Sequence, residues 1–385
     1  MRPTRSLFAA AAVALLSVTA ACGSGGGAST GSAGKPSEFA IDFVLDVTGV
    51  SQTFSPAVRQ GWDLRIEQAN AAKELRGTTL STNVHDTRSD PRTGAGLMAE
   101  VGAGEAPLAV FGTSSSVAPA VAPVAQQAGL PLVTIYSGSP GVVDAGDHVF
   151  RVTAPQYTYH HLQSEYFKAN GVKRVAIVYN NDIGTLKDLA ENYYPKAAAQ
   201  DGYEIVQSSG VSAKAPDLSS EMTGVLGSNP DAVLMLVLGQ QNTSIVTQLR
   251  RASFPGVIAA QPGVGNQALL ALGPAADGIV YPIDFSAATT SAAGKDFVNA
   301  YQARYGSAPD TFAASGYDGA SMAVAALAAA PEFTREALLQ SISDITAKGL
   351  DGASGTVRFD GRDARVDGMM VRWENGRETL VAPPA

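Results

Sequence analysis

From Phe39 onward, short apolar runs alternate with segments of helical periodicity, and this alternation restricts the fold more than any other feature of the sequence. Residues 40–45 form an apolar run. The following segment places Val58, Trp62, Ile66 and Ala69 three or four residues apart, which gives a helix one buried stripe. Alternation of this kind is typical of βαβ units with a largely parallel sheet. The sequence therefore predicts an α/β protein.

The same pattern continues through the chain and predicts further elements. Ser55 and Pro56 suit an N-cap and a first-turn proline for the first helix. Further strands are expected at 79–85, 108–111, 132–136, 174–179, 232–238 and 278–281. Further helices are expected near 94–101, 117–127, 186–199 and 315–329, and a closing hairpin at 369–374 and 377–381 around Asn375-Gly376. The 385 residues favour two domains, and Pro155, between 151 and 157, suits a crossover between two comparable halves.

The amino terminus has the features of an export signal. Arg2 and Arg5 precede a short apolar core at 7–18, too short for a comfortable membrane span, so residues 1–21 are expected to be a cleaved signal peptide. Cys22 is the one cysteine in the sequence, and residues 18–22 resemble a bacterial lipobox, in which the cysteine carries a lipid. The alternative is a chance cysteine beside an ordinary cleavage site, because Thr19 stands where Leu or Val is usual.

The segment after Cys22 favours the lipid interpretation. Residues 22–37 are rich in Gly, Ser and Ala and form a flexible tether in this prediction. No later segment is long and apolar enough to span a membrane. We therefore expect an extracytoplasmic protein that the lipidated Cys22 anchors to the outer face of the cell membrane.

Composition and motifs exclude several classes of function. The net charge is −8 and no basic tract is present, so nucleic acid is an unsuitable partner. The sequence contains no G-x-S-x-G elbow, no P-loop and no H-E-x-x-H pattern. We accordingly expect no enzyme, no metal site and no cofactor.

Two loops at expected strand ends are rich in hydroxyl groups. Residues 113–116 are Thr-Ser-Ser-Ser, and residues 137–139 are Ser-Gly-Ser. Ligands of open parallel sheets gather at the carboxyl ends of strands, and free N–H groups at helix starts bind carboxylates. We expect both loops to open helices and to hold a carboxylate. The alternative is N-capping, which explains one serine in each loop but not three consecutive serines.

Several motifs together resemble those of the type I periplasmic binding proteins, specifically the leucine/isoleucine/valine-binding family of branched-chain amino-acid ABC transporters. The segments that carry the resemblance are 48–70, 86–91, 112–116, 129–133 and 313–320, which includes the sequence Tyr-Asp-Gly-Ala. Their order and spacing match the family over some 300 residues. The resemblance implies two Rossmann-like lobes joined by a multi-strand hinge, with lobe 1 at 38–154 plus about 284–360 and lobe 2 at 155–283 plus about 361–385.

The resemblance also implies where a ligand binds. On the first lobe it points to the loop of Ser115 and Ser116 and to the loop of Tyr136, Gly138 and Ser139, where the family holds an α-carboxylate. It adds Phe54 as an aromatic packing residue. On the second lobe it points to Asp182 and Ile183, to Gln240 and to Gln261.

The sequence departs from the family in two places. Amino-acid binders commonly have a Glu near Gln261 that pairs with the ligand's ammonium group, and no acid stands there. Ile183 replaces a usual aromatic residue. A buried ammonium group without a counter-charge is costly, so either Asp182 or Asp284 substitutes, or the ligand has no α-amino group.

The expected function is that of a monomeric receptor for an ABC importer, which captures an amino acid, an amide or a small carboxylate by hinge closure and then docks on a membrane permease. A ligand sensor with a membrane signalling partner is the alternative, and the sequence does not separate the two. A secreted hydrolase would require a histidine beside Ser115 or Ser139.

Overall fold

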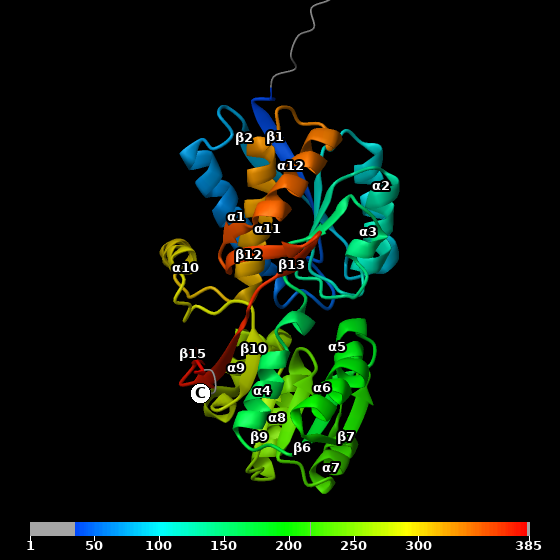
Figure 1. The fold of residues 1–385 in the computed structure, drawn as a ribbon, viewed down its shortest axis with the longest axis vertical. Helices are drawn as coiled ribbons and strands as arrows, with labels where there is room; N and C mark the ends of the chain where they lie inside the picture. The colour runs from blue at the N-terminus through cyan, green and yellow to red at the C-terminus, as the bar shows by residue number, and fades with distance from the viewer. Residues whose placement is uncertain (1–34, 216, 383–385) are drawn as a thin grey trace, which may run out of the picture. The chain divides into compact units, whose positions relative to one another are not determined.

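A computed structural model describes residues 35–382 of the chain apart from residue 216 (Figure 1). The predicted signal peptide at 1–21, the predicted lipidation site Cys22 and most of the predicted tether at 22–37 lie outside the described residues. Within the described part, no helix is long and apolar enough to cross a membrane.

The first of two sheets has eight strands in the order β11-β12-β13-β5-β4-β3-β1-β2. Strands β1 to β5 pair in parallel, β13 pairs in parallel with β5, and β11 to β13 pair antiparallel with one another. The bounds are β1 Glu38–Leu45, β2 Thr79–Asp86, β3 Ala109–Gly112, β4 Leu132–Ile135, β5 Val149–Arg151, β11 Leu350–Gly352, β12 Gly355–Asp360 and β13 Asp363–Arg365.

The second sheet has seven strands in the order β15-β14-β10-β9-β8-β6-β7. Strands β6 to β10 pair in parallel, and the hairpin of β14 and β15 adds antiparallel to β10. The bounds are β6 Arg174–Asn180, β7 Glu204–Val211, β8 Ala232–Leu236, β9 Val257–Ala260, β10 Val280–Ile283, β14 Met369–Glu374 and β15 Arg377–Leu380.

Helices flank both sheets (Figure 1). Those in the segments of the first sheet are α1 Ser55–Ala72, α2 Pro91–Ala103, α3 Ala118–Gln127, α10 Ala292–Tyr305, α11 Thr311–Ala329 and α12 Arg335–Lys348. Those in the segments of the second sheet are α4 His161–Ala169, α5 Gly184–Asp188, α6 Tyr194–Asp201, α7 Ser219–Gly227, α8 Gln240–Arg251 and α9 Asn266–Leu272. A π-helical turn at Leu189–Tyr193 joins α5 to α6, and short 3-10 turns lie at Val143–Ala145, Gln156–Thr158, Pro262–Val264 and Gly273–Ala276.

The chain passes between the sheets three times, after β5, after β10 and after β13. The predicted fold class, two α/β halves with parallel-rich sheets and several connecting strands, is confirmed. The residue limits predicted for the two lobes stay a prediction.

Helices α1 and α11 pack closely against each other beside the first sheet. Trp62 of α1 contacts Phe43 of β1 with ring centroids 4.6 Å apart, and both side chains are fully buried. A Cβ atom at Gly61 would lie 1.8 Å from the carbonyl oxygen of Ala313, and one at Gly316 would lie 1.9 Å from that of Val58. Because no side chain fits there, the two glycines let the helix backbones touch.

Two local predictions are wrong. Helix α1 begins at Ser55 itself, and the Ser55 hydroxyl donates to the carbonyl oxygens of Asp46 and Ser51 instead of capping; Pro56 does lie in the first turn. No helix opens at 137–139, where the carbonyl oxygens of Ser137 and Ser139 accept hydrogen bonds from Arg151 instead of from the N–H groups of a following helical turn.

Candidate ligand-binding pocket

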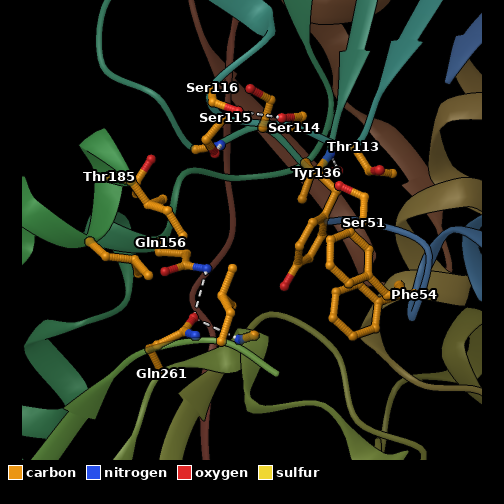
Figure 2. A pocket seen from close by; sticks show the side chains of 18 of the residues that line it. Ser51, Phe54, Thr113, Ser114, Ser115, Ser116, Tyr136, Gln156, Thr185 and Gln261 are labelled. Carbon is orange, nitrogen blue, oxygen red and sulfur yellow. Dashed lines mark hydrogen bonds between the residues drawn. The ribbon is translucent and has the colours of Figure 1, made fainter. Parts of the chain in front are cut away.

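One pocket is lined by loops that follow strands of both sheets, at their carboxyl ends (Figure 2). This is the edge at which ligands of open parallel sheets bind. Its lining consists of hydroxyl, amide, aromatic, aliphatic and glycine residues, without one charged side chain: Val50, Ser51, Phe54, Thr113, Ser114, Ser115, Ser116, Tyr136, Ser137, Gly138, Thr153, Ala154, Gln156, Tyr159, Ile183, Thr185, Leu186, Leu238, Gln261, Gly263 and Phe312.

The loop between β3 and α3 presents hydrogen-bond donors to this pocket. Ser114 and Ser116 share a hydrogen bond of 2.8 Å between their hydroxyl oxygens, and the Ser115 hydroxyl oxygen accepts from the N–H of Gly138 at 3.1 Å. Among the described residues, nothing accepts from the N–H groups of Ser115 and Ser116. Helix α3 begins directly afterwards, and the positive end of its dipole faces this loop.

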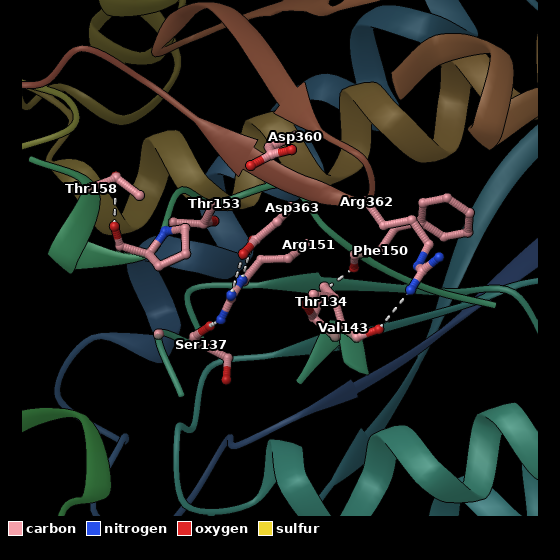
Figure 3. Close-up of polar contacts among 12 residues, drawn as sticks. Thr134, Ser137, Val143, Phe150, Arg151, Thr153, Thr158, Asp360, Arg362 and Asp363 are labelled. Carbon is pink, nitrogen blue, oxygen red and sulfur yellow. Dashed lines mark hydrogen bonds and ion pairs between the residues drawn. The ribbon is translucent and has the colours of Figure 1, made fainter. Parts of the chain in front are cut away.

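A buried ion pair behind the pocket holds the second loop, 137–139, in place (Figure 3). The Arg151 side chain is 1 % exposed, and its guanidinium group donates two hydrogen bonds of 2.7 Å to the carboxylate of Asp363 on β13. Its third nitrogen donates to the carbonyl oxygens of Ser137 and Ser139 at 3.0 and 2.8 Å.

These hydrogen bonds of Arg151 also determine the direction of the N–H of Gly138. In a trans peptide the carbonyl and the following N–H point in opposite directions. Since the Ser137 carbonyl points to Arg151, the Gly138 N–H points away from Arg151 and reaches Ser115. The Ser139 hydroxyl donates to the carbonyl of Ser115 and joins the two loops from outside the pocket lining.

Three aromatic rings form one wall of the pocket. Phe54, immediately before α1, stacks on Phe312 of α11 with centroids 4.7 Å apart and planes at 11°. Tyr136 contacts Phe312 at 4.6 Å. Burial raises the pKa of the Tyr136 hydroxyl well above its ordinary value, with a further contribution from the charge of Asp284, so it remains protonated. The close approach of α1 and α11 therefore brings two distant phenylalanines together.

The side of the pocket that belongs to the second sheet is formed by aliphatic and amide residues. Ile183, Leu186 and Leu238 supply the apolar surface. The Gln261 side chain makes three hydrogen bonds. One amide N–H donates to the carbonyl of Val237 at 2.9 Å, and the amide oxygen accepts from the N–H of Gly263 at 2.7 Å and from the Gln156 side chain at 3.3 Å. Gln261 thus orients Gln156 (Figure 2).

Several buried polar atoms of the lining have no hydrogen-bond partner among the described residues. They are the hydroxyl oxygens of Tyr136, Ser137 and Thr185 and the amide oxygen of Gln156. Buried polar groups are almost always paired, with protein, water or ligand. These four atoms are therefore the places where a bound ligand would gain hydrogen bonds.

The structure brings most of the predicted site residues into this lining: Phe54, Ser115, Ser116, Tyr136, Gly138, Ile183 and Gln261. Ser139, Asp182 and Gln240 are not in it. Asp182 is exposed, and its carboxylate accepts from the Ser212 hydroxyl and the Ala213 N–H; Gln240 is exposed at the start of α8. Whether these ten residues contact a ligand stays a prediction.

Other lining residues had no part in the sequence prediction. Gln156 lies in the crossover predicted at 151–157, but a lone glutamine carries no pattern. Phe312 immediately precedes the segment 313–320 and could have been noticed there. Thr185 lies two residues after Ile183, at the start of α5.

No histidine lines the pocket, so the arrangement that a serine hydrolase requires is not present at Ser115. Within the described residues there is also no group of three or more His, Cys, Asp or Glu side chains that could hold a metal ion. The lining of the pocket offers hydrogen-bonding groups and apolar surface.

Comparison with known proteins agrees with this geometry. A family model described as periplasmic binding protein matches residues 40–377. The chain belongs to the periplasmic binding protein family. Proteins of this family bind solutes and are not enzymes, and membership implies a place outside the cytoplasm. The predicted resemblance and the prediction that the chain is not an enzyme are confirmed.

Solved structures of periplasmic binding proteins share the fold. The leucine-binding protein LivK of Thermotoga maritima is 24% identical, with a TM-score of 0.79 over 89% of this chain and 97% of that one. LivJ of Streptococcus pneumoniae, solved with isoleucine, is 23% identical, with a TM-score of 0.78 and coverage of 89% and 97%. A solute-binding protein of Rhodopseudomonas palustris, solved with 3,4-dihydroxybenzoic acid, is 22% identical, with a TM-score of 0.79 and coverage of 90% and 96%. No curated protein sequence matches the chain.

Proposed function

We propose that this periplasmic binding protein is the solute receptor of an ABC importer, which captures an amino acid or a related small carboxylate between two lobes that close about the three connecting segments. The observation that carries the proposal is a pocket lined by loops at the carboxyl ends of strands of both sheets, with four buried polar atoms that have no partner among the described residues. Two of the solved relatives bind isoleucine and 3,4-dihydroxybenzoic acid, which are both small carboxylates.

The first test is a thermal-shift screen of the purified protein against amino acids, amides and small carboxylates. A solute that binds only the folded state raises the melting temperature by mass action. A hit that X-ray scattering also shows to compact the protein supports capture by closure. A solute that raises the melting temperature without compacting the protein would contradict closure. If no compound of a broad solute library raises the melting temperature, solute capture would be contradicted.

Ser115→Ala tests the placement of the site. The variant removes one donor to a desolvated anion, which costs about 1.5–3 kcal/mol and thus about ten-fold or more in affinity. Titration calorimetry with the best compound of the screen measures the change. Ser219→Ala, at the exposed start of α7, is the matched control and should bind as the parent does. Equal affinity of Ser115→Ala and the parent would refute this placement.

The proposal includes lipid anchoring at Cys22 and a monomeric receptor that docks on a permease. Mass spectrometry of the protein from its host membrane should show a diacylglycerol-modified Cys22, and Cys22→Ser should move the protein to the soluble fraction. Retention of the variant on the membrane would contradict the anchor. If the membrane partner is a signalling protein instead of a permease, the alternative function of a ligand sensor would be favoured.

A further inference from the structure

The lining of the pocket contains no charged side chain, neither acidic nor basic. An α-amino acid carries both an ammonium and a carboxylate group into such a site. Burying an ionised group without a counter-charge or several hydrogen bonds costs several kcal/mol, on the order of the whole affinity for a small ligand. Each charged end of an amino acid therefore needs its own partners in the pocket.

For a carboxylate, the first sheet supplies hydrogen-bond donors in place of a cation. The N–H groups of Ser115 and Ser116 have no described acceptor, and the Ser115 hydroxyl retains its proton for donation because its oxygen accepts from Gly138. Acceptance of that hydrogen bond polarises the hydroxyl and strengthens it as a donor. Beside them lie Ser137, 1 % exposed, and Thr185, 7 % exposed, whose hydroxyl oxygens are unpartnered.

For an ammonium group, no acid is available in the pocket. The carboxylate of Asp182 is exposed and accepts from Ser212 and Ala213. Asp284 is buried outside the lining, where its carboxylate accepts from the Thr311 hydroxyl, and burial raises its pKa to about 6. Asp46 is buried behind Ser51, and its oxygens accept from Ser51 and Thr87.

Apart from its polar groups, the pocket offers apolar surface on two sides. The rings of Phe54, Phe312 and Tyr136 form one wall, and Ile183, Leu186 and Leu238 lie on the side of the second sheet. A flat apolar body between an aromatic and an aliphatic wall gains both burial and ring contact. Away from the serine loop, the free groups are neutral: the amide oxygen of Gln156 and the Tyr136 hydroxyl.

We infer that the pocket selects monocarboxylic acids with a flat apolar body and a neutral polar far end, and that it discriminates against α-amino acids because its lining holds no carboxylate to balance the charge of an ammonium group. This inference rests on the proposed function and specifies its ligand class. Of the two explanations for the absence of an acid near Gln261, it selects a ligand without an α-amino group.

Matched pairs that differ by the amino group alone test the inference on the purified full-length protein. The pairs are tyrosine with 3-(4-hydroxyphenyl)propanoate, phenylalanine with 3-phenylpropanoate, and leucine with 4-methylpentanoate; benzoate and 4-hydroxybenzoate complete the panel. Titration calorimetry should give dissociation constants at least ten-fold lower for the acids than for their amino-acid partners. Amino acids that bind as tightly as their partners would overturn the inference and leave solute capture standing.

If no compound of the panel binds measurably, the inferred ligand class would also be overturned. The broad solute library then decides separately whether capture itself fails, so the two failures are distinguishable.

A designed counter-charge gives a second test. A Cβ atom at Gly138 would lie 3.3 Å from the Thr185 methyl carbon, so Thr185 lies directly beside the loop expected to hold the carboxylate. Thr185→Asp places an acid beside the position expected for an α-ammonium group. Thr185→Asn is the neutral isostere of this variant. The preference for the acid over the amino acid should fall at least ten-fold in Thr185→Asp relative to Thr185→Asn. Equal preferences in the two variants would overturn the inference.

Discussion

Arg151 shows how one residue can support the pocket without lining it. Its side chain has a buried carboxylate partner in Asp363 and two carbonyl partners in the loop 137–139. The loop carries Gly138 and its N–H, which reaches Ser115. The position of the Ser115 hydroxyl thus depends on a guanidinium group that is not part of the pocket lining.

Arg151→Ala should therefore be severely destabilising. Removal of one partner of a buried ion pair leaves the other uncompensated, which costs about 3–5 kcal/mol of the free energy of unfolding, as urea denaturation would measure. Arg358→Ala is the matched control, because Arg358 pairs with Asp367 in a bridge whose side chains are 62% and 88% exposed, and such pairs contribute little. Similar losses in both variants would show that the burial of Arg151 has no energetic consequence.

At the residue scale, the sequence predicted which two loops of the first sheet lie together in the pocket lining better than it predicted the residues that support them. Ser115 and Gly138 follow neighbouring parallel strands, and the carboxyl ends of such strands meet at one edge, so their proximity was predictable. Gln156 and Arg151 were not predicted, because their roles depend on partners more than 100 residues away in Gln261 and Asp363. No local pattern specifies such a pair.

At the scale of elements, the crossing of α1 and α11 connects packing to the pocket. Gly61 and Gly316 allow backbone contact, and the same two helices bring Phe54 and Phe312 into a stack. The distance between the helices therefore determines the geometry of the aromatic wall.

Gly316→Ala tests this connection. The added methyl group would lie 1.9 Å from the Val58 carbonyl oxygen, which cannot move without its helix, so we expect a loss of about 1–3 kcal/mol or more in the free energy of unfolding and weaker solute binding. Gly96→Ala in α2 is the control: nothing lies within 4 Å of its Cβ, and relief of glycine's backbone entropy should stabilise by about 0.5–1 kcal/mol. Stability of Gly316→Ala equal to that of the parent would contradict the close crossing.

The elements that the sequence predicted are those with strong apolar periodicity. Strand β8 and the hairpin of β14 and β15 lie within two residues of their expected positions. Strands β5 and β13 have three residues each. The edge strand β7 has neither a continuous apolar run nor a regular alternation of polar and apolar residues, so none of the three stands out from a loop. Their place in the sheets follows from pairing with distant strands, which a single sequence does not display.

At the scale of the whole molecule, buried ionisable groups link stability to pH. Burial raises the pKa of Asp318 to about 7 and that of Asp284 to about 6, from an ordinary value of 3.8. Both side chains are buried, and their hydrogen bonds only partly offset the effect. Burial has the opposite effect on His160, whose pKa falls from 6.5 to about 3.

The signs follow from proton binding. Between about pH 4 and 7, the folded state retains a proton on Asp318 that the unfolded chain releases, and the same holds for Asp284 up to about pH 6. The free energy of unfolding therefore falls as pH rises through this window, by up to about 1.4 kcal/mol per pH unit and proton. His160 contributes the reverse between about pH 3 and 6.5, because there the unfolded chain binds the extra proton. Burial also raises the pKa of Glu378 from 4.5 to about 7, so this group acts in the same direction as the two aspartates. With these three acids against one base, the net slope is negative.

Urea denaturation at intervals from pH 4.5 to 8 should consequently show lower stability towards neutral pH. Asp284→Asn, whose amide oxygen can still accept from Thr311, should flatten the slope below pH 6. His160→Gln should steepen it, because the opposing contribution is removed while the position stays neutral and polar. A packing loss lowers the free energy of unfolding by the same amount at every pH, whereas a shifted pKa changes its slope with pH. Opposite changes of this slope in the two variants therefore report the pKa shifts and not the packing. A slope that is unchanged in both variants would mean that neither group keeps its shifted pKa in the folded protein.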